Sequence, residues 1–92
     1  MDETSMTTDI ALSLAGRDKG KTFLVIGVDG GRALLADGKL RRIEHPKSKS
    51  LKHLRFLAHG NLQTAQKIRE GTIVSNREIR RVLAVFNAGR PQ

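Results

Sequence analysis

The 92-residue chain contains no cysteine, tryptophan or tyrosine, and it has only three phenylalanines. Without cysteine there is no disulfide framework, and zinc sites built on thiolates are excluded. No apolar run approaches the roughly 20 residues that a membrane-spanning helix needs. The acidic, polar stretch 1–6 has neither the basic start nor the apolar run of a signal peptide, so we expect a cytoplasmic protein.

Residues suited to catalysis or metal binding are also scarce. His45, His53 and His59 lack the spacing of a metal site, which needs three or four convergent ligands. The aspartates of the central region stand at predicted turns, where Asp commonly caps backbone N–H groups. No phosphate-binding glycine loop and no nucleophile elbow occurs. We therefore expect no enzyme, no metal, no cofactor and no small-molecule substrate.

What the chain does have is positive charge. Seventeen Lys and Arg stand against nine Asp and Glu, a net charge of +8. Residues 1–9 carry −3, residues 10–60 carry +7 and residues 61–92 carry +4. Such a domain attracts polyanions, of which nucleic acid is the commonest in a cell. The alternative is a merely solubilising surface charge. A membrane-surface role would need a long basic amphipathic helix, which the pattern does not offer.

Apolar alternation and turn residues predict a β-rich domain. The expected strands are 10–15, 22–28, 32–36, 39–44 and a closing strand within 51–57. The second is apolar on both parities, which is typical of a strand buried on both faces. Asp37-Gly38 predicts a tight hairpin, and 45–50 reads as a flexible basic loop. Five short strands joined by tight turns predict a mainly β fold, a small five-stranded SH3-like barrel.

The remainder of the chain changes to helical spacing. A helix is expected over 61–70, and Ser75 with Glu78 forms a capping-box pattern before a second helix. The apolar stripe from Ile79 to Phe86 should pack on the outer side of the second strand, with a partner groove as the alternative. The predicted organisation is a disordered acidic tail at 1–9, a barrel at 10–58 and a helical extension of one or two helices at 61–89.

The stretch Ala-Gly-Arg-Asp-Lys-Gly-Lys at 15–21, placed between two β-type runs, resembles a KOW motif. That motif occurs in several ribosomal proteins and in transcription elongation factors. Residues 36–42 and 51–54 are similar to the KOW-containing large-subunit ribosomal proteins of archaea and eukaryotes, and to short bacterial KOW proteins described as RNA-binding. The resemblance covers about 10–57. It implies a KOW-type barrel that binds ribosomal RNA.

The candidate RNA-contact residues lie on the turn after the first strand and on the basic segments around the fourth. They are Arg17, Lys19, Gly20, Lys21, Arg41, Arg42, Lys47, Lys49, Lys52 and His53. If the two segments share one rim of the barrel, their cations can neutralise phosphates without reading sequence. Gly20 either permits close backbone approach to a phosphate or simply serves turn geometry, and the two readings are compatible.

The scarcity of aromatic side chains indicates which form of nucleic acid the chain would bind. Each phenylalanine lies in an apolar pattern and is expected in the core, so stacking on single strands is undersupplied. Folded or double-helical RNA fits better, although nothing in the sequence separates RNA from DNA. The alternative from another class is a protein-interaction module. It would dock a ribosome- or transcription-associated factor through the barrel or the stripe 79–86.

Overall fold

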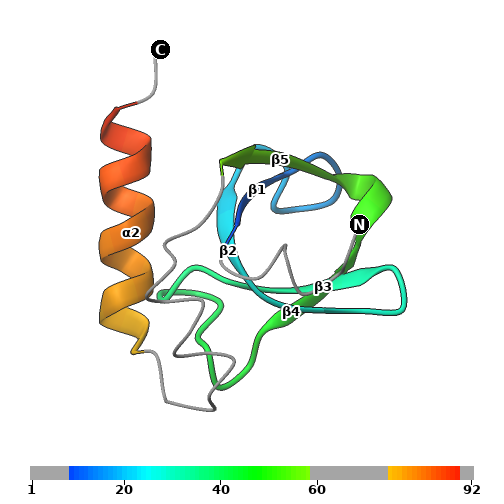
Figure 1. The fold of residues 1–92 in the computed structure, drawn as a ribbon, viewed down its shortest axis with the longest axis horizontal. Coiled ribbons are helices and arrows are strands. Elements are labelled where there is room, and N and C mark those ends of the chain that lie inside the picture. Colours follow the sequence, from blue (N-terminus) through cyan, green and yellow to red (C-terminus); the bar gives the residue numbers. More distant parts are fainter. Residues whose placement is uncertain (1–8, 59–74, 90–92) are drawn as a thin grey trace.

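The computed structural model describes residues 9–58 and 75–89. In chain order the elements are β1 (Ile10–Ser13), β2 (Thr22–Asp29), β3 (Arg32–Ala36), β4 (Lys47–Ser50), the 3-10 helix η2 (Leu51–His53), β5 (Leu54–Ala58) and α2 (Asn76–Ala88). The strands form one antiparallel sheet in the order β4-β3-β2-β1-β5. Figure 1 shows the sheet curling into a ring with α2 along one side. The predicted class, a small mainly β barrel with a C-terminal helix, is confirmed.

The interior of the barrel is a compact apolar cluster. Its buried members are Ala11, Phe23, Val25, Ala33, Leu35 and Leu54, with Val28 and Leu51 packed against them. Phe23 and Val25 share one parity of β2, but Val28 has the opposite parity. A register shift between Val25 and Gly27 explains this, because one extra residue in a strand reverses which side chains face inward.

The outer side of β2 carries the second cluster, and α2 covers it. Ile79 and Leu83 of the helix are buried with Ile10, Leu24 and Ala36. Ile26, Val82 and Phe86 pack around this cluster. An isolated helix of this length is marginal in water. The burial of Ile79 and Leu83, about 1.5–3 kcal/mol each, therefore supplies much of what holds α2 on the barrel.

The start of α2 follows the predicted cap. The Ser75 hydroxyl oxygen accepts a hydrogen bond from the Glu78 N–H at 3.1 Å, which satisfies one of the N–H groups that a helix start leaves unpaired. Gly89 follows the last helical residue. Buried Asn76 then ties this end of the helix to the barrel side: its Oδ1 accepts from Ile43 N–H at 2.8 Å, and its Nδ2 donates to Glu44 Oε1 at 2.8 Å.

The predicted strand at 39–44 is wrong. Asp37 folds this segment into a closed loop, because its Oδ1 accepts from the N–H groups of Lys39 at 2.8 Å and Arg41 at 2.9 Å. The Arg41 carbonyl in turn accepts from the N–H groups of Asp37 and Gly38. These bonds occupy the backbone groups that a strand would need, so side chain-to-backbone bonding replaces the expected hairpin.

The fourth strand lies at Lys47–Ser50 instead, in the segment predicted to be a flexible loop. It pairs with β3 from Leu35↔Lys47 to Arg32↔Ser50. Its inward position is Lys49, a buried lysine. A strand whose inward residue is a lysine has no apolar alternation to reveal it.

Residues 1–8 and the helix expected at 61–70 lie outside the described residues. Asp9, assigned by prediction to the tail, instead continues the pairing of β1 with β2 by one residue. It is buried, and its carbonyl accepts from Val25 N–H at 2.9 Å. Within 9–58 and 75–89, no helix has the length and apolar character needed to cross a membrane.

Candidate functional site

The turn between β1 and β2 is closed by backbone hydrogen bonds, and its Lys and Arg side chains are exposed to solvent. Ser13 N–H donates to Lys21 O at 3.0 Å, and Gly20 N–H donates to Ser13 O at 2.9 Å. Gly20 takes a φ of 87°, and no atom lies within 4 Å of where its Cβ would be. Turn geometry thus accounts for this glycine. Arg17, Lys19 and Lys21 are exposed on this loop.

Asp18, in the middle of the same loop, points inward. Lys49 Nζ donates to Asp18 Oδ1 and to Ala15 O, both at 2.6 Å, and to Ser13 Oγ at 2.7 Å. The Ser13 hydroxyl donates to Asp18 Oδ1 at 2.6 Å. Asp18 Oδ2 has no well-formed hydrogen bond among the described residues, and the Lys47 ammonium compensates it from 2.7 Å. One buried carboxylate therefore joins the basic turn to β4.

The environment of Asp18 favours its ionised form. Burial by itself raises the pKa of this carboxyl, but the Lys47 and Lys49 ammonium groups and the Ser13 hydroxyl outweigh burial. Together they hold the pKa of Asp18 well below its ordinary value. The carboxylate stays charged across the physiological range, and it fixes the base of the turn that carries the exposed cations.

Two adjoining hollows open between the basic turn, the loop 37–41 and α2. The larger, about 510 Å³, is lined on the helix side by Arg80, Leu83, Ala84 and Asn87. The smaller, about 160 Å³, is lined by Arg17, Phe23, Arg41 and Lys47, among others. Lys21, Asp37 and Leu40 line both, so the hollows form one concave surface. We call it the basic groove.

The described cations of the basic groove are Arg17, Lys21, Lys39, Arg41, Lys47 and Arg80. The first four are exposed, and none of these four pairs with a carboxylate of the described chain. The acids that line the groove, Asp18 and Asp37, are bound to lysines or to backbone N–H groups. The open charge in the groove is therefore positive, which suits an anionic partner.

Helix α2 fixes the far wall of the groove. Arg80 Nη1 donates to Gly38 O at 2.6 Å. Gly38 has a φ of 79°, and a Cβ on it would stand 2.4 Å from Asn76 O. Thr22 on β2 and Asn87 near the helix end are also linked, with Asn87 Nδ2 donating to Thr22 Oγ1 at 3.1 Å. Figure 1 shows the segment after β3 reaching the N-terminal half of α2.

The expected common rim exists for part of the predicted set. Arg17, Gly20, Lys21, Arg41 and Lys47 line the groove. Lys19 stands exposed on the same turn. Arg17 and Lys47, 30 positions apart in sequence, thus face one hollow, because the β1–β2 turn and the segment that leads from β3 into β4 meet at one end of the barrel.

The remaining predicted residues lie elsewhere. The prediction that Lys49 contacts RNA is wrong. Its side chain is 10% exposed, and its three N–H groups donate hydrogen bonds to acceptors within the protein, so none is left for a phosphate. Arg42 is exposed beside Glu44, 3.6 Å from its carboxylate. Lys52 and His53 lie on η2 and line neither hollow. A hydrogen bond from Leu51 N–H to Gly31 O holds η2 beside the β2–β3 turn.

The groove residues that sequence reasoning missed include Lys39, Leu40 and Arg80. Lys39 and Leu40 had been assigned to a strand, and their position depends on the loop that Asp37 closes. Arg80 is contributed from 42 residues beyond Gly38. The one available signal was its place next to Ile79 in the apolar stripe, which puts Arg80 at the margin of the helix face that packs on the barrel.

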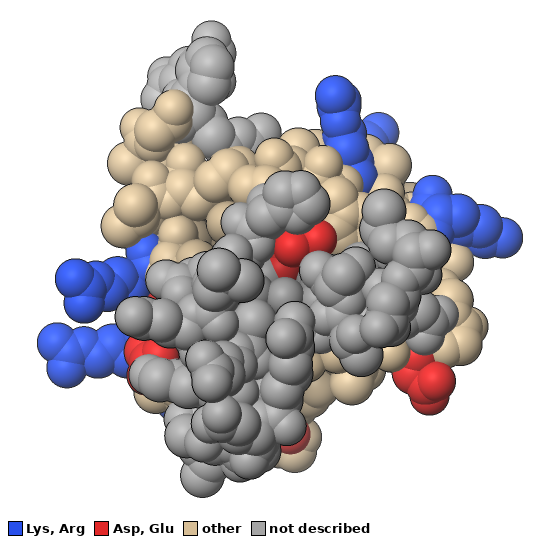
Figure 2. Space-filling view, in the orientation of Figure 1, with Lys and Arg blue, Asp and Glu red and all other residues tan. Residues whose placement is uncertain are grey.

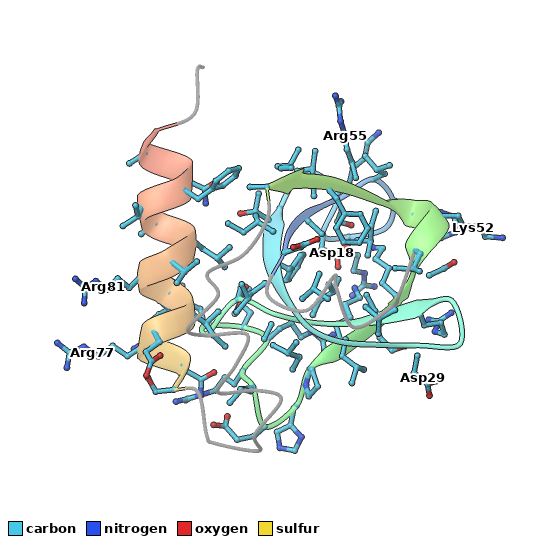
Figure 3. All side chains as sticks on the ribbon, in the orientation of Figure 1. Asp18, Asp29, Lys52, Arg55, Arg77 and Arg81 are labelled. Atoms are coloured by element: carbon cyan, nitrogen blue, oxygen red, sulfur yellow. The ribbon has the colours of Figure 1, made fainter. Side chains whose placement is uncertain are left out.

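Other cations point away from the groove. Figure 3 shows Arg77 and Arg81 projecting from α2, whereas Lys52 projects from the far side of the barrel and Arg55 from its top in this view. In Figure 2 blue side chains project at these sides. These charges extend the positive field without sharing a hollow with the groove. In the described part of the chain no group of three or more His, Asp or Glu side chains could hold a metal ion.

Comparison with known proteins adds no family assignment. No protein-family model matches the chain, and no curated protein is significantly similar to it.

Proposed function

We propose that this protein binds structured RNA, ribosomal RNA in the first place, and that the basic groove is the contact surface. The observation that carries the proposal is the convergence of six cations from the β1–β2 turn, the β3–β4 loop, the start of β4 and α2 on one concave surface. Cations in such a groove neutralise phosphates and fix a protein on a nucleic-acid backbone. The choice of ribosomal RNA comes from the resemblance of 15–21 to a KOW motif.

The form of the RNA follows from the side chains at hand. Phe23 is 2% exposed, and Phe86 packs against the outer cluster. Phe56 does not lie in the core, as its apolar pattern had predicted: it is 37% exposed on β5, outside the groove. The described groove therefore offers no open ring on which successive bases could stack. Recognition through phosphates and helix shape is the mode that this surface supports.

The alternative, a protein-interaction module, drew on the barrel or on the apolar stripe of α2. Ile79 and Leu83 are 0% and 6% exposed against the barrel, so this stripe is occupied internally. Because the stripe packs on the barrel, no specific observation on α2 favours that alternative. The function we propose is non-enzymatic RNA binding.

The test is the affinity for folded ribosomal RNA fragments as a function of salt, with duplex DNA and single strands measured beside them. About five phosphate contacts, from the four open cations of the groove and Lys19, predict a log–log slope on the order of −3.5 to −4.5. A steep slope with preference for folded RNA is the expected result. A flat slope, or equally weak binding to all three nucleic acids, would contradict the proposal.

A double variant, Lys19→Glu with Lys21→Glu, tests the turn itself. Both side chains are exposed, so the variant should fold as the wild type does and bind RNA more weakly. Circular dichroism verifies the fold. Unchanged RNA affinity in the folded variant would remove the β1–β2 turn from the contact surface.

A further inference from the structure

The tip of the loop 37–41 carries an exposed apolar side chain amid the cations of the groove. Leu40 is 80% exposed, more than any other large hydrophobic residue of the described chain. A single exposed leucine is common and by itself needs no explanation. Leu40 differs in its setting, because it lines both hollows and stands between Lys39 and Arg41.

The loop holds Leu40 rigidly. The N–H groups of both neighbours, Lys39 and Arg41, donate to Asp37 Oδ1, and the Arg41 carbonyl closes the loop by accepting from Asp37 and Gly38. Arg80 Nη1 then binds Gly38 O, which attaches the loop to α2. The side chain thus projects from a braced backbone, and ordering it on binding costs little conformational entropy.

The chemistry around Leu40 selects the partner. Cations on both sides suit two phosphates, and an apolar tip between them suits the face of a base. Bases in a continuous RNA helix are stacked, and their deep major groove excludes side chains. A base face becomes accessible where the helix is interrupted by an unpaired nucleotide. Leucine is among the side chains that proteins place against unstacked base steps.

The larger hollow offers room for such a nucleotide. Its volume, about 510 Å³, lies within the ~300–1,000 Å³ range of small-molecule sites. Leu83 and Ala84 of α2 line it together with Lys21 and Lys39, so the hollow has both apolar and cationic lining. A base seated there would meet Leu40 on one side and α2 on the other, with its phosphates near the lysines.

We propose that Leu40 is a wedge that recognises an unpaired nucleotide in an RNA helix, seated in the larger hollow of the basic groove. This inference rests on the proposed RNA-binding function and specifies which RNA the groove prefers. It makes bulged or junction-containing helices the ligand class, in preference to continuous duplexes.

The experiment compares a hairpin RNA that has one unpaired adenosine in its stem with the same hairpin without it. Wild-type protein should bind the bulged RNA at least about tenfold more tightly, the lower end of the change expected for burial of one leucine side chain. Leu40→Ser should lower the affinity for the bulged RNA about tenfold and leave the continuous hairpin unchanged. Leu40→Met should keep the preference. With 2-aminopurine as the unpaired base, wild type should change its fluorescence and Leu40→Ser should not.

Val85→Ser is the matched control, because Val85 is 70% exposed on α2 and lines neither hollow. It should bind both RNAs as wild type does. Equal wild-type affinity for the two hairpins, or a preference that survives Leu40→Ser, overturns the wedge while RNA binding stands. Failure of the wild type to bind either hairpin overturns both the wedge and the proposed function.

Discussion

The ammonium of Lys49 and the carboxylate of Asp18 lie 2.6 Å apart, each with a side chain only 10% exposed. This pair joins β4 to the basic turn, 31 residues away in sequence. Removing one partner of a buried ion pair leaves an uncompensated charge. The resulting loss of folding stability exceeds the stability that the intact pair contributes. The pair therefore explains why a lysine occupies the inward position of β4.

Lys49→Met should lower the free energy of unfolding by about 2–4 kcal/mol, because Asp18 then keeps Lys47 as its only cation. Urea unfolding monitored by circular dichroism measures the change. Lys19→Met removes the same charge from an exposed position of the turn and should alter stability by less than about 0.5 kcal/mol. Equal effects of the two substitutions would show that Lys49 has no structural role.

Acid should weaken the fold through Asp18. Its ordinary pKa is 3.8, and the folded protein holds the pKa of Asp18 well below that value. As the pH falls below about 4, the unfolded chain takes up this proton first, so the stability that the carboxylate contributes above that pH is progressively lost. Urea midpoints at several pH values between 6 and about 2 should therefore fall more steeply for wild type than for Asp18→Asn. Parallel curves for the two proteins would contradict this role.

Much of the barrel follows from the sequence. The apolar runs predicted strands at 22–28 and 32–36, and the observed strands are Thr22–Asp29 and Arg32–Ala36. The Ser75 cap and the stripe beyond it predicted α2. These elements are recognisable because local preference and burial agree in them.

The groove is harder to foresee, because long-range contacts decide it. The sequence did not predict β4, because the inward residue of this strand is a lysine. Its partner, Asp18, is distant in sequence, so no local pattern reveals the pair. The sequence pattern predicted a strand after Gly38, but in the structure the backbone N–H groups of this segment donate to the Asp37 side chain. Arg80 reaches the groove only because Ile79 packs on the barrel.

The contact between Gly38 and α2 should tolerate no side chain. A Cβ on Gly38 would lie 2.4 Å from Asn76 O and 2.8 Å from Arg80 Cγ. Gly31 has nearly the same φ, 78° against 79°, with no atom within 4 Å. Gly31→Ala should therefore cost only the backbone strain of about 1–2 kcal/mol. Gly38→Ala should cost a further 1–3 kcal/mol, roughly, for the clash. Thermal and urea unfolding measure both, and equal losses would mean that α2 does not press on Gly38.

The most direct test of RNA binding by the basic groove compares two variants of equal net charge. Lys21→Glu with Lys39→Glu reverses two groove cations, whereas Arg77→Glu with Arg81→Glu reverses two cations that project from α2 away from it. RNA affinity is measured for both across a salt series, after circular dichroism has verified each fold. The groove variant should lose most of its affinity, and its log–log slope should shrink by about two phosphate contacts, roughly 1.4–1.8. The α2 variant should lose little. Equal losses in both would show that affinity follows net charge alone, and would contradict a groove-centred site.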